Sequence, residues 1–157
     1  MDLPKRKPTR LKDYNYNSEG AYFITICTHN RKNLFSDIVG AIHESPEIKL
    51  NSKGFIVEKY INQLNTRFAS EIDKYVIMPN HIHLIAVVDE RSIRESTLHK
   101  RSIISNTIGY FKMNVSREIH KNGYWGEIWQ RSFHDHIIRG ENDHKKIWEY
   151  IDTNPQK

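Results

Sequence analysis

Residues 78–85 are Met-Pro-Asn-His-Ile-His-Leu-Ile, and this stretch is the most informative about the fold of the chain. After the proline and asparagine, histidine alternates with aliphatic residues, a pattern typical of a strand with one face in a hydrophobic core. Because successive side chains of a strand point to opposite faces, His81 and His83 would share one face, opposite Ile82 and Leu84. Neutral imidazoles held side by side suit a divalent metal ion. The stretch therefore predicts a buried strand that presents a metal-binding pair.

Length and composition favour one cytoplasmic domain over residues 1–157. A chain of 157 residues with 38% hydrophobic content can bury one sizeable core. Lys and Arg number 24 against 19 Asp and Glu, a net charge of +5 that favours nucleic acid over a membrane surface as partner. No run approaches the ~18 apolar residues of a membrane span, and the first residues lack the apolar stretch of a secretory signal. The single cysteine, Cys27, cannot form an internal disulfide and is predicted to pack as a small apolar residue.

Apolar periodicity predicts an α+β fold. The first residues are rich in lysine, arginine and proline, so we expect a flexible basic arm over residues 1–19. The order of the predicted elements indicates an antiparallel sheet with helices packed on one face, as in ferredoxin-like and RRM-like folds. The predicted strands are Ala21–Thr28, Ile72–Met78, His81–Val88 and an extended segment over Glu127–Arg139. The predicted helices are Ser52–Phe68, Ser96–His120, and a C-terminal helix that Asn142 caps and Pro155 ends.

Two polar residues near the C-terminus could complete a site with the histidine pair. Tyr150 and Asn154 are four residues apart and would share one face of the C-terminal helix. Asn154 can offer a neutral oxygen to a metal ion held by His81 and His83, and Tyr150 can supply a nucleophile. The alternative is structural, since a tyrosine on an amphipathic helix often packs half-buried and an asparagine before proline often ends a helix.

The order of three segments resembles one known family. Residues 78–84, 129–139 (Trp-Gln-Arg-Ser-Phe-His-Asp-His-Ile-Ile-Arg) and 150–155 (Tyr-Ile-Asp-Thr-Asn-Pro) follow one another as in the REP-associated tyrosine transposases, which belong with the single-tyrosine HUH transposases. The similarity extends to residues 20–31 and 109–112, and so covers most of the chain. The C-terminal helix would then be the one that carries the catalytic tyrosine.

The resemblance implies a metal-dependent enzyme that cleaves and rejoins single-stranded DNA at a hairpin. It makes His81, His83 and Asn154 the ligands of Mg²⁺ or Mn²⁺, and Tyr150 the nucleophile that forms a 5′-phosphotyrosine link. Stacking surfaces, amides and cations are the groups that hold single-stranded bases and phosphates. The residues expected to contact DNA are Trp129, Gln130, Arg131, His136, Arg139 and Lys112.

Several alternatives stay open at the level of sequence. The same surface could bind hairpin DNA without any strand transfer. Tyr110 could replace Tyr150 as nucleophile, because an amide, Asn114, also lies four residues after it. His134 and His136 form a second His-x-His that could bind zinc with another ligand. Trp129 could simply pack in the core, and the resemblance leaves open whether the protein works alone or as a homodimer.

Overall fold

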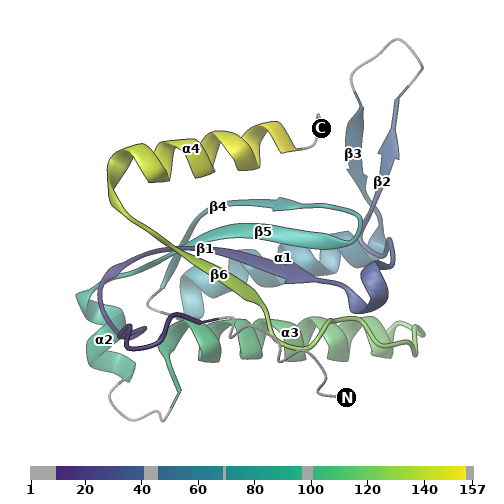
Figure 1. Cartoon of the computed structure of the whole chain (residues 1–157). Helices are drawn as coiled ribbons and strands as arrows, with labels where there is room; N and C mark the ends of the chain where they lie inside the picture. Colours follow the sequence, from purple (N-terminus) through teal and green to yellow (C-terminus); the bar gives the residue numbers. More distant parts are fainter. Residues whose placement is uncertain (1–9, 41–45, 69, 97–100, 155–157) are drawn as a thin grey trace, which may run out of the picture.

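A four-stranded antiparallel sheet forms the centre of the protein. The computed structural model describes residues 10–40, 46–68, 70–96 and 101–154, and Figure 1 shows their arrangement. The strands lie in the order β4-β5-β1-β6, and every neighbouring pair is antiparallel. Their bounds are Gly20–Cys27 for β1, Glu71–Ile77 for β4, His81–Val88 for β5 and His134–Ile138 for β6. The predicted α+β fold with an antiparallel sheet is confirmed.

Two helices pack on one face of this sheet and enclose the core (Figure 1). They are α1, Ser52–Arg67, and α3, Ile103–Lys121, and they contact each other. The sheet meets them with aliphatic side chains of alternate positions, such as Ile24, Ile82 and Leu84, which are fully buried. Because strand side chains alternate, one face of the sheet packs in the core, and the residues between these core positions lie on the opposite face.

The helix predicted to begin at Ser96 begins later in the structure and is preceded by a separate short helix. A short helix, α2, spans Glu90–Ser96, and α3 begins only at Ile103. The Ser102 hydroxyl caps α3 by accepting a hydrogen bond from the backbone N–H of Ser105 at 3.3 Å. The predicted start was wrong because a side-chain cap fixes where a helix begins, and the apolar period does not reveal it.

The C-terminal helix, α4, spans Gly140–Thr153 and lies on the opposite face of the sheet from α3, against β4 and β5 (Figure 1). It begins two residues before the predicted cap, Asn142, which lies inside the helix. Asp143 instead provides a hydrogen-bond acceptor at the start of the helix, since its Oδ2 accepts a hydrogen bond from the backbone N–H of Arg139 at 2.9 Å. Pro155, the predicted end, lies outside the described residues.

Besides α2, two parts of the structure have no counterpart in the sequence prediction. Strands β2 (Ser36–Val39) and β3 (Glu47–Leu50) form a separate two-stranded sheet, and residues 29–31 form a 3₁₀ turn, η1. The two strands are mostly exposed, with Ile38 63% accessible, so no buried face imposes an alternating pattern on them. Such short exposed strands leave little trace in a sequence.

The N-terminal segment is not a free arm from Arg10 onward. Residues 1–9 lie outside the described residues. Tyr14 and Tyr16 lie 5.0 Å apart between ring centroids, and both pack against the buried Tyr22, at 6.4 and 6.1 Å. The predicted flexible arm over residues 1–19 was wrong for this part, because aromatic side chains anchor it to the helix-facing side of the sheet.

No helix of the described residues is long and apolar enough to cross a membrane.

Candidate active site

Pairing between β1 and β5 gathers a set of polar and aromatic side chains on the face opposite the core. His83 pairs with Thr25, and His81 pairs with Cys27, so these side chains share one face. The imidazole rings of His81 and His83 lie 4.6 Å apart between centroids. Cys27 is buried and free, as the sequence indicates. The strand thus presents the two rings together.

Hydrogen bonds at Nδ1 orient both rings. Nδ1 of His81 lies 2.7 Å from Oδ1 of Asn80, and because an amide oxygen only accepts, the hydrogen of His81 is on Nδ1 and its Nε2 carries the lone pair. Nδ1 of His83 lies 2.9 Å from the hydroxyl of Thr25, which allows the same tautomer. A partner at one ring nitrogen is the usual arrangement that directs the other toward a metal ion.

Burial keeps both rings neutral at physiological pH. It lowers the pKa of His83 to about 4, and the neighbouring charges of His81 and Arg31 act in the same direction. The pKa of His81 is also lowered, mainly by burial and further by the charge of Arg31. An unprotonated imidazole is the form that binds a metal ion. The environment of the pair therefore favours ligation over a role as an acid.

Helix α4 carries Tyr150 to this pair. The ring of Tyr150 lies 5.5 Å from the ring of His83 and 6.1 Å from that of Phe23, in edge-on geometry to both. Phe23 in turn stacks on His83 at 5.1 Å. The tyrosine is 42% exposed, so it is both beside the histidine and accessible from solvent. Residues 67 positions apart in the chain thus form one cluster.

Asn154 lies one helical turn beyond Tyr150 and is buried, with 8% exposure. Its Nδ2 has no hydrogen-bond partner among the described residues. A buried amide N–H without a partner among the described residues is unusual and indicates a hydrogen-bond acceptor, such as a water molecule, at that position. Among the described residues, no group of three or more His, Cys, Asp and Glu side chains could bind a metal ion. A metal ion held by His81 and His83 would need a further protein ligand, and the side-chain oxygen of Asn154 is a candidate. Two imidazoles and one amide oxygen are ligand types that a divalent cation accepts.

Polar contacts hold α4 over the edge strand β4. Nζ of Lys74 lies 2.7 Å from the carboxylate of Asp152 and 3.7 Å from the ring centroid of Trp148. Nε2 of His144 lies 2.9 Å from the carboxylate of Asp73. Next to His144, near the start of the helix, Asp143 lies 3.2 Å from Nε2 of His136 on β6. These contacts fix the direction in which the helix crosses the sheet.

In the segment predicted to hold DNA, some side chains contact other parts of the protein and others are exposed to solvent. Trp129 packs against Phe35 and Phe111, with ring centroids at 5.1 and 5.7 Å, and its Nε1 donates to the backbone oxygen of Lys112 at 3.0 Å. This geometry favours the core-packing alternative for Trp129. Lys112 donates to the backbone oxygens of Gln130 and Ser132, at 2.8 and 3.0 Å.

The other predicted DNA contacts lie on or near β6. Gln130 is half-buried, while Arg131, His136 and Arg139 are exposed. His134 pairs with Thr25, so the second His-x-His is on the same face as the first, one strand beyond Thr25. Both of its histidines are exposed, and His136 contacts the carboxylate of Asp143. Among the described residues, however, no group of three or more His, Cys, Asp and Glu side chains could bind a metal ion here.

Tyr110, the rival nucleophile, lies on α3 on the helix side of the sheet. Its ring packs on Phe68 at 5.1 Å and under the guanidinium of Arg67 at 4.8 Å. The amide of Asn114 donates to the backbone oxygen of Tyr110 at 2.8 Å. The geometry therefore favours Tyr150 over Tyr110 as the tyrosine that works with the histidine pair.

The sequence prediction missed three residues that organise the site. They are Asn80, Thr25 and Phe23, which contact the two histidines and Tyr150. Asn80 stands next to His81 in the sequence, and an amide beside a candidate metal ligand is a signal that could have identified it. Thr25 and Phe23 depend on the register between two strands that are distant in the chain.

Comparison with known proteins agrees with this geometry. The family model described as "Transposase IS200 like" matches residues 17–154, which is most of the chain and includes every residue of the cluster. The chain belongs to this family of IS200-like transposases. An uncharacterized protein of Haemophilus influenzae is 37% identical to it over 164 residues, covering 96% of this chain and 88% of the relative.

Two solved structures show the same fold. A REP-associated tyrosine transposase bound to a REP hairpin superposes with a TM-score of 0.64 at 20% identity, over 93% of this chain and 73% of that one. A crystal structure from Deinococcus radiodurans gives a TM-score of 0.53 at 14% identity, over 92% of this chain and 95% of that one. The family indicated by the three sequence segments and the fold predicted from apolar periodicity are both confirmed for this IS200-like transposase.

Proposed function

We propose that this IS200-like transposase cleaves and rejoins single-stranded DNA through a covalent 5′-phosphotyrosine intermediate on Tyr150. The observation that carries the proposal is the 5.5 Å separation between the rings of Tyr150 and His83. A phenol beside two neutral imidazoles and a buried amide combines a nucleophile with the ligand types for a divalent cation.

The proposed ligands of Mg²⁺ or Mn²⁺ are Nε2 of His81, Nε2 of His83 and the side-chain oxygen of Asn154. A bound divalent cation would draw charge from the phosphate oxygens and stabilise the charge that develops in the transition state. Asn80 and Thr25 hold the two rings, and Phe23 confines the space between His83 and Tyr150. This set positions the phenol and the phosphate together, which supplies much of the catalysis in such a reaction.

The proposed step exchanges one phosphodiester bond for another. The oxygen of Tyr150 bonds to phosphorus and loses its proton, while the bond from phosphorus to the 3′-oxygen breaks and that oxygen gains a proton. The products are a free 3′-hydroxyl and a strand joined to Tyr150 through its 5′-phosphate. A 3′-hydroxyl can later attack this link and release the tyrosine, so that strands are rejoined without another energy source.

Hairpin-forming single-stranded DNA is the proposed partner. The fold relative solved with a REP hairpin supports this choice, as does the net charge of +5. Exposed Arg131, His136 and Arg139 are the proposed contacts near β6, together with the side chain of Gln130. Because Tyr150 and the histidine pair of one chain already lie side by side, a single chain carries the proposed site, and a homodimer stays a prediction.

A denaturing-gel assay tests the proposal. Purified protein is incubated with labelled hairpin-bearing single strands and Mn²⁺ or Mg²⁺, and we expect a denaturation-resistant adduct that disappears with a chelator. Tyr150→Phe should abolish the adduct, whereas the matched control Tyr110→Phe should retain it. An adduct that persists in Tyr150→Phe would contradict the assignment. Tight, salt-sensitive hairpin binding without an adduct in either metal would instead indicate a non-catalytic DNA-binding protein.

A further inference from the structure

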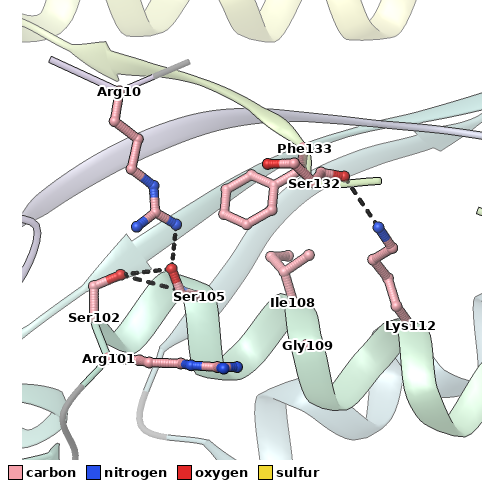
Figure 2. A pocket seen from close by; sticks show the side chains of 9 residues that line it. All are labelled: Arg10, Arg101, Ser102, Ser105, Ile108, Gly109, Lys112, Ser132 and Phe133. Carbon is pink, nitrogen blue, oxygen red and sulfur yellow. Dashed lines mark hydrogen bonds between the residues drawn. The ribbon is translucent and has the colours of Figure 1, made fainter. Parts of the chain in front are cut away.

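A cavity of about 480 Å³ lies beside α3, on the helix side of the sheet (Figure 2). Its walls come from three separate segments: the N-terminal segment at Arg10, the start and first turns of α3, and residues 132–133 before β6. Three of the lining residues are cations, Arg10, Arg101 and Lys112, and none is a carboxylate. An open cavity with this lining attracts anions.

Hydroxyl groups and a guanidinium occupy one end of the cavity. The Ser102 hydroxyl lies 2.9 Å from the hydroxyl of Ser105 at the start of α3, and Arg10 donates a hydrogen bond to Ser105 (Figure 2). The guanidinium of Arg10 also lies over the rings of Tyr16 and Phe133, 5.5 Å from each centroid, which holds it in place.

The guanidinium of Arg101 has no comparable anchor. It is exposed and makes no hydrogen bond or ion pair with the part of the chain that the structure describes. A charged fork with five donors, standing at the rim of a cationic cavity, is therefore available to a ligand. Bidentate binding of phosphate is the recognition for which arginine is best suited.

Gly109 is an independent indication that a ligand approaches this surface. It lies in the middle of α3 and lines the cavity, and a Cβ built on it meets no atom within 4 Å. Packing therefore does not require glycine here, although glycine weakens a helix interior relative to alanine. A glycine at such a place leaves room for a close approach of a ligand to the helix backbone.

We propose that this cavity binds a backbone phosphate of the DNA and that Arg101 makes the main contact with it. The hydroxyls of Ser102 and Ser105 and the guanidinium of Arg10 line the same end of the cavity. The proposal rests on the proposed function, since it assumes DNA as the partner. Because α3 and α4 lie on opposite faces of the sheet, this contact is separate from the phosphate that Tyr150 attacks (Figure 1). The cavity would hold the hairpin in register while the cleaved strand lies on the other face.

Two variants test the cavity by different means, one removing charge and one removing space. Arg101→Gln removes the free guanidinium, and Gly109→Leu fills the cavity without a change in charge. Leucine is a good helix former, so Gly109→Leu should fold at least as stably as the parent, which circular dichroism and thermal melting would verify. The control is Arg117→Gln, which removes an exposed cation from the same helix roughly 20 Å further along.

Binding of a fluorescent DNA hairpin is measured by anisotropy over a series of salt concentrations, with every variant built on Tyr150→Phe so that no chemistry is needed. We expect Arg101→Gln to weaken binding about 3- to 10-fold at low salt and to reduce the slope of log Kd against log salt by about one. Gly109→Leu should weaken binding to a similar extent, and Arg117→Gln by less than about 2-fold.

The outcomes separate this proposal from the proposed function. If Arg101→Gln and Gly109→Leu bind the hairpin as tightly as Arg117→Gln does, the assignment of the cavity to DNA is overturned, whatever the adduct assay shows. Inorganic phosphate binding, detected by calorimetry and lost in Gly109→Leu while hairpin affinity is unchanged, would assign the cavity to a small phosphate ligand and also overturn it. A protein that shows the expected binding differences but never forms an adduct would retain the cavity proposal and contradict only the strand-transfer chemistry.

Discussion

Replacing Ile151 with alanine should release α4 from the sheet without unfolding the sheet. Ile151 is 1% exposed and is the one buried apolar residue among the described residues of α4. The change removes three carbon atoms, worth about 2.4 kcal/mol at ~0.8 kcal/mol for each buried methylene. The void left behind places the total within the range of about 2 to 5 kcal/mol observed for isoleucine-to-alanine changes in cores.

The ion pairs of α4 are much weaker than this burial. The ion pair between Lys74 and Asp152 joins side chains that are 23% and 58% exposed, and exposed pairs are worth about 1 kcal/mol at most. The pair between His144 and Asp73 is similarly exposed, with 37% and 38% of the side chains accessible. Burial of Ile151 therefore contributes more than either ion pair to the docking of α4 and so to the placement of Tyr150.

Native-state hydrogen exchange measures this docking directly. A loss of about 2.4 kcal/mol corresponds to roughly 50-fold faster exchange for amides whose protection depends on α4 being docked. We expect this acceleration in α4 of Ile151→Ala, with unchanged protection in β1 and β5. Asp152→Ala serves as the control and should accelerate exchange in α4 by less than about 5-fold.

Two results would refute the reasoning. Unchanged exchange in α4 of Ile151→Ala would mean that the polar contacts alone hold the helix. Equal acceleration in α4, β1 and β5 would mean that the helix belongs to the same cooperative unit as the core, so that its docking is not a separate event.

Three further changes have defined expectations. Gly54→Ala places a Cβ against the backbone oxygen of Phe35 and should cost about 1 to 3 kcal/mol in urea unfolding, or more if the loop cannot shift. Hydrogen bonding from Lys59 lowers the pKa of Glu118, so the stabilisation from this carboxylate is present above its ordinary pKa of 4.5 and lost as the pH falls through the lowered value. The difference in melting temperature between the parent and Glu118→Gln should accordingly be largest near pH 7 and shrink below pH 4.5; a difference that grows in acid would contradict this sign. Asp143→Ala removes the acceptor at the start of α4 and should lower helix protection by about 1 kcal/mol in hydrogen exchange, whereas Asp143→Asn should retain part of it.

The strands and helices that bury a continuous apolar face could be predicted from sequence. The strand with His81 and His83, and the helices that carry Ile61 and Phe111, follow from local periodicity because one side of each must face the core. Exposed elements were missed for the opposite reason: β2 and β3 bury little, and nothing in their pattern is constrained.

The average composition of the N-terminal segment misled the prediction, because the contacts of a few aromatic residues determine its structure. The segment after Arg10 has the polar and basic content of a free arm, yet Tyr14 and Tyr16 hold it against Tyr22. Two aromatic contacts are enough to order a short segment, and no average over the segment reveals them. The cavity at Arg101 depends on the same ordering, since Arg10 forms part of its wall.

The sequence alone determined two local relations within the candidate site. His81 and His83 share a face because strand side chains alternate, and Tyr150 and Asn154 share a face because a helix turns once in about 3.6 residues. Only the tertiary structure decided that these two faces meet, with Tyr150 5.5 Å from His83 and Thr25 2.9 Å from its Nδ1. Periodicity fixes the direction of neighbouring side chains, whereas strand register and helix docking depend on the packing of residues far apart in the chain.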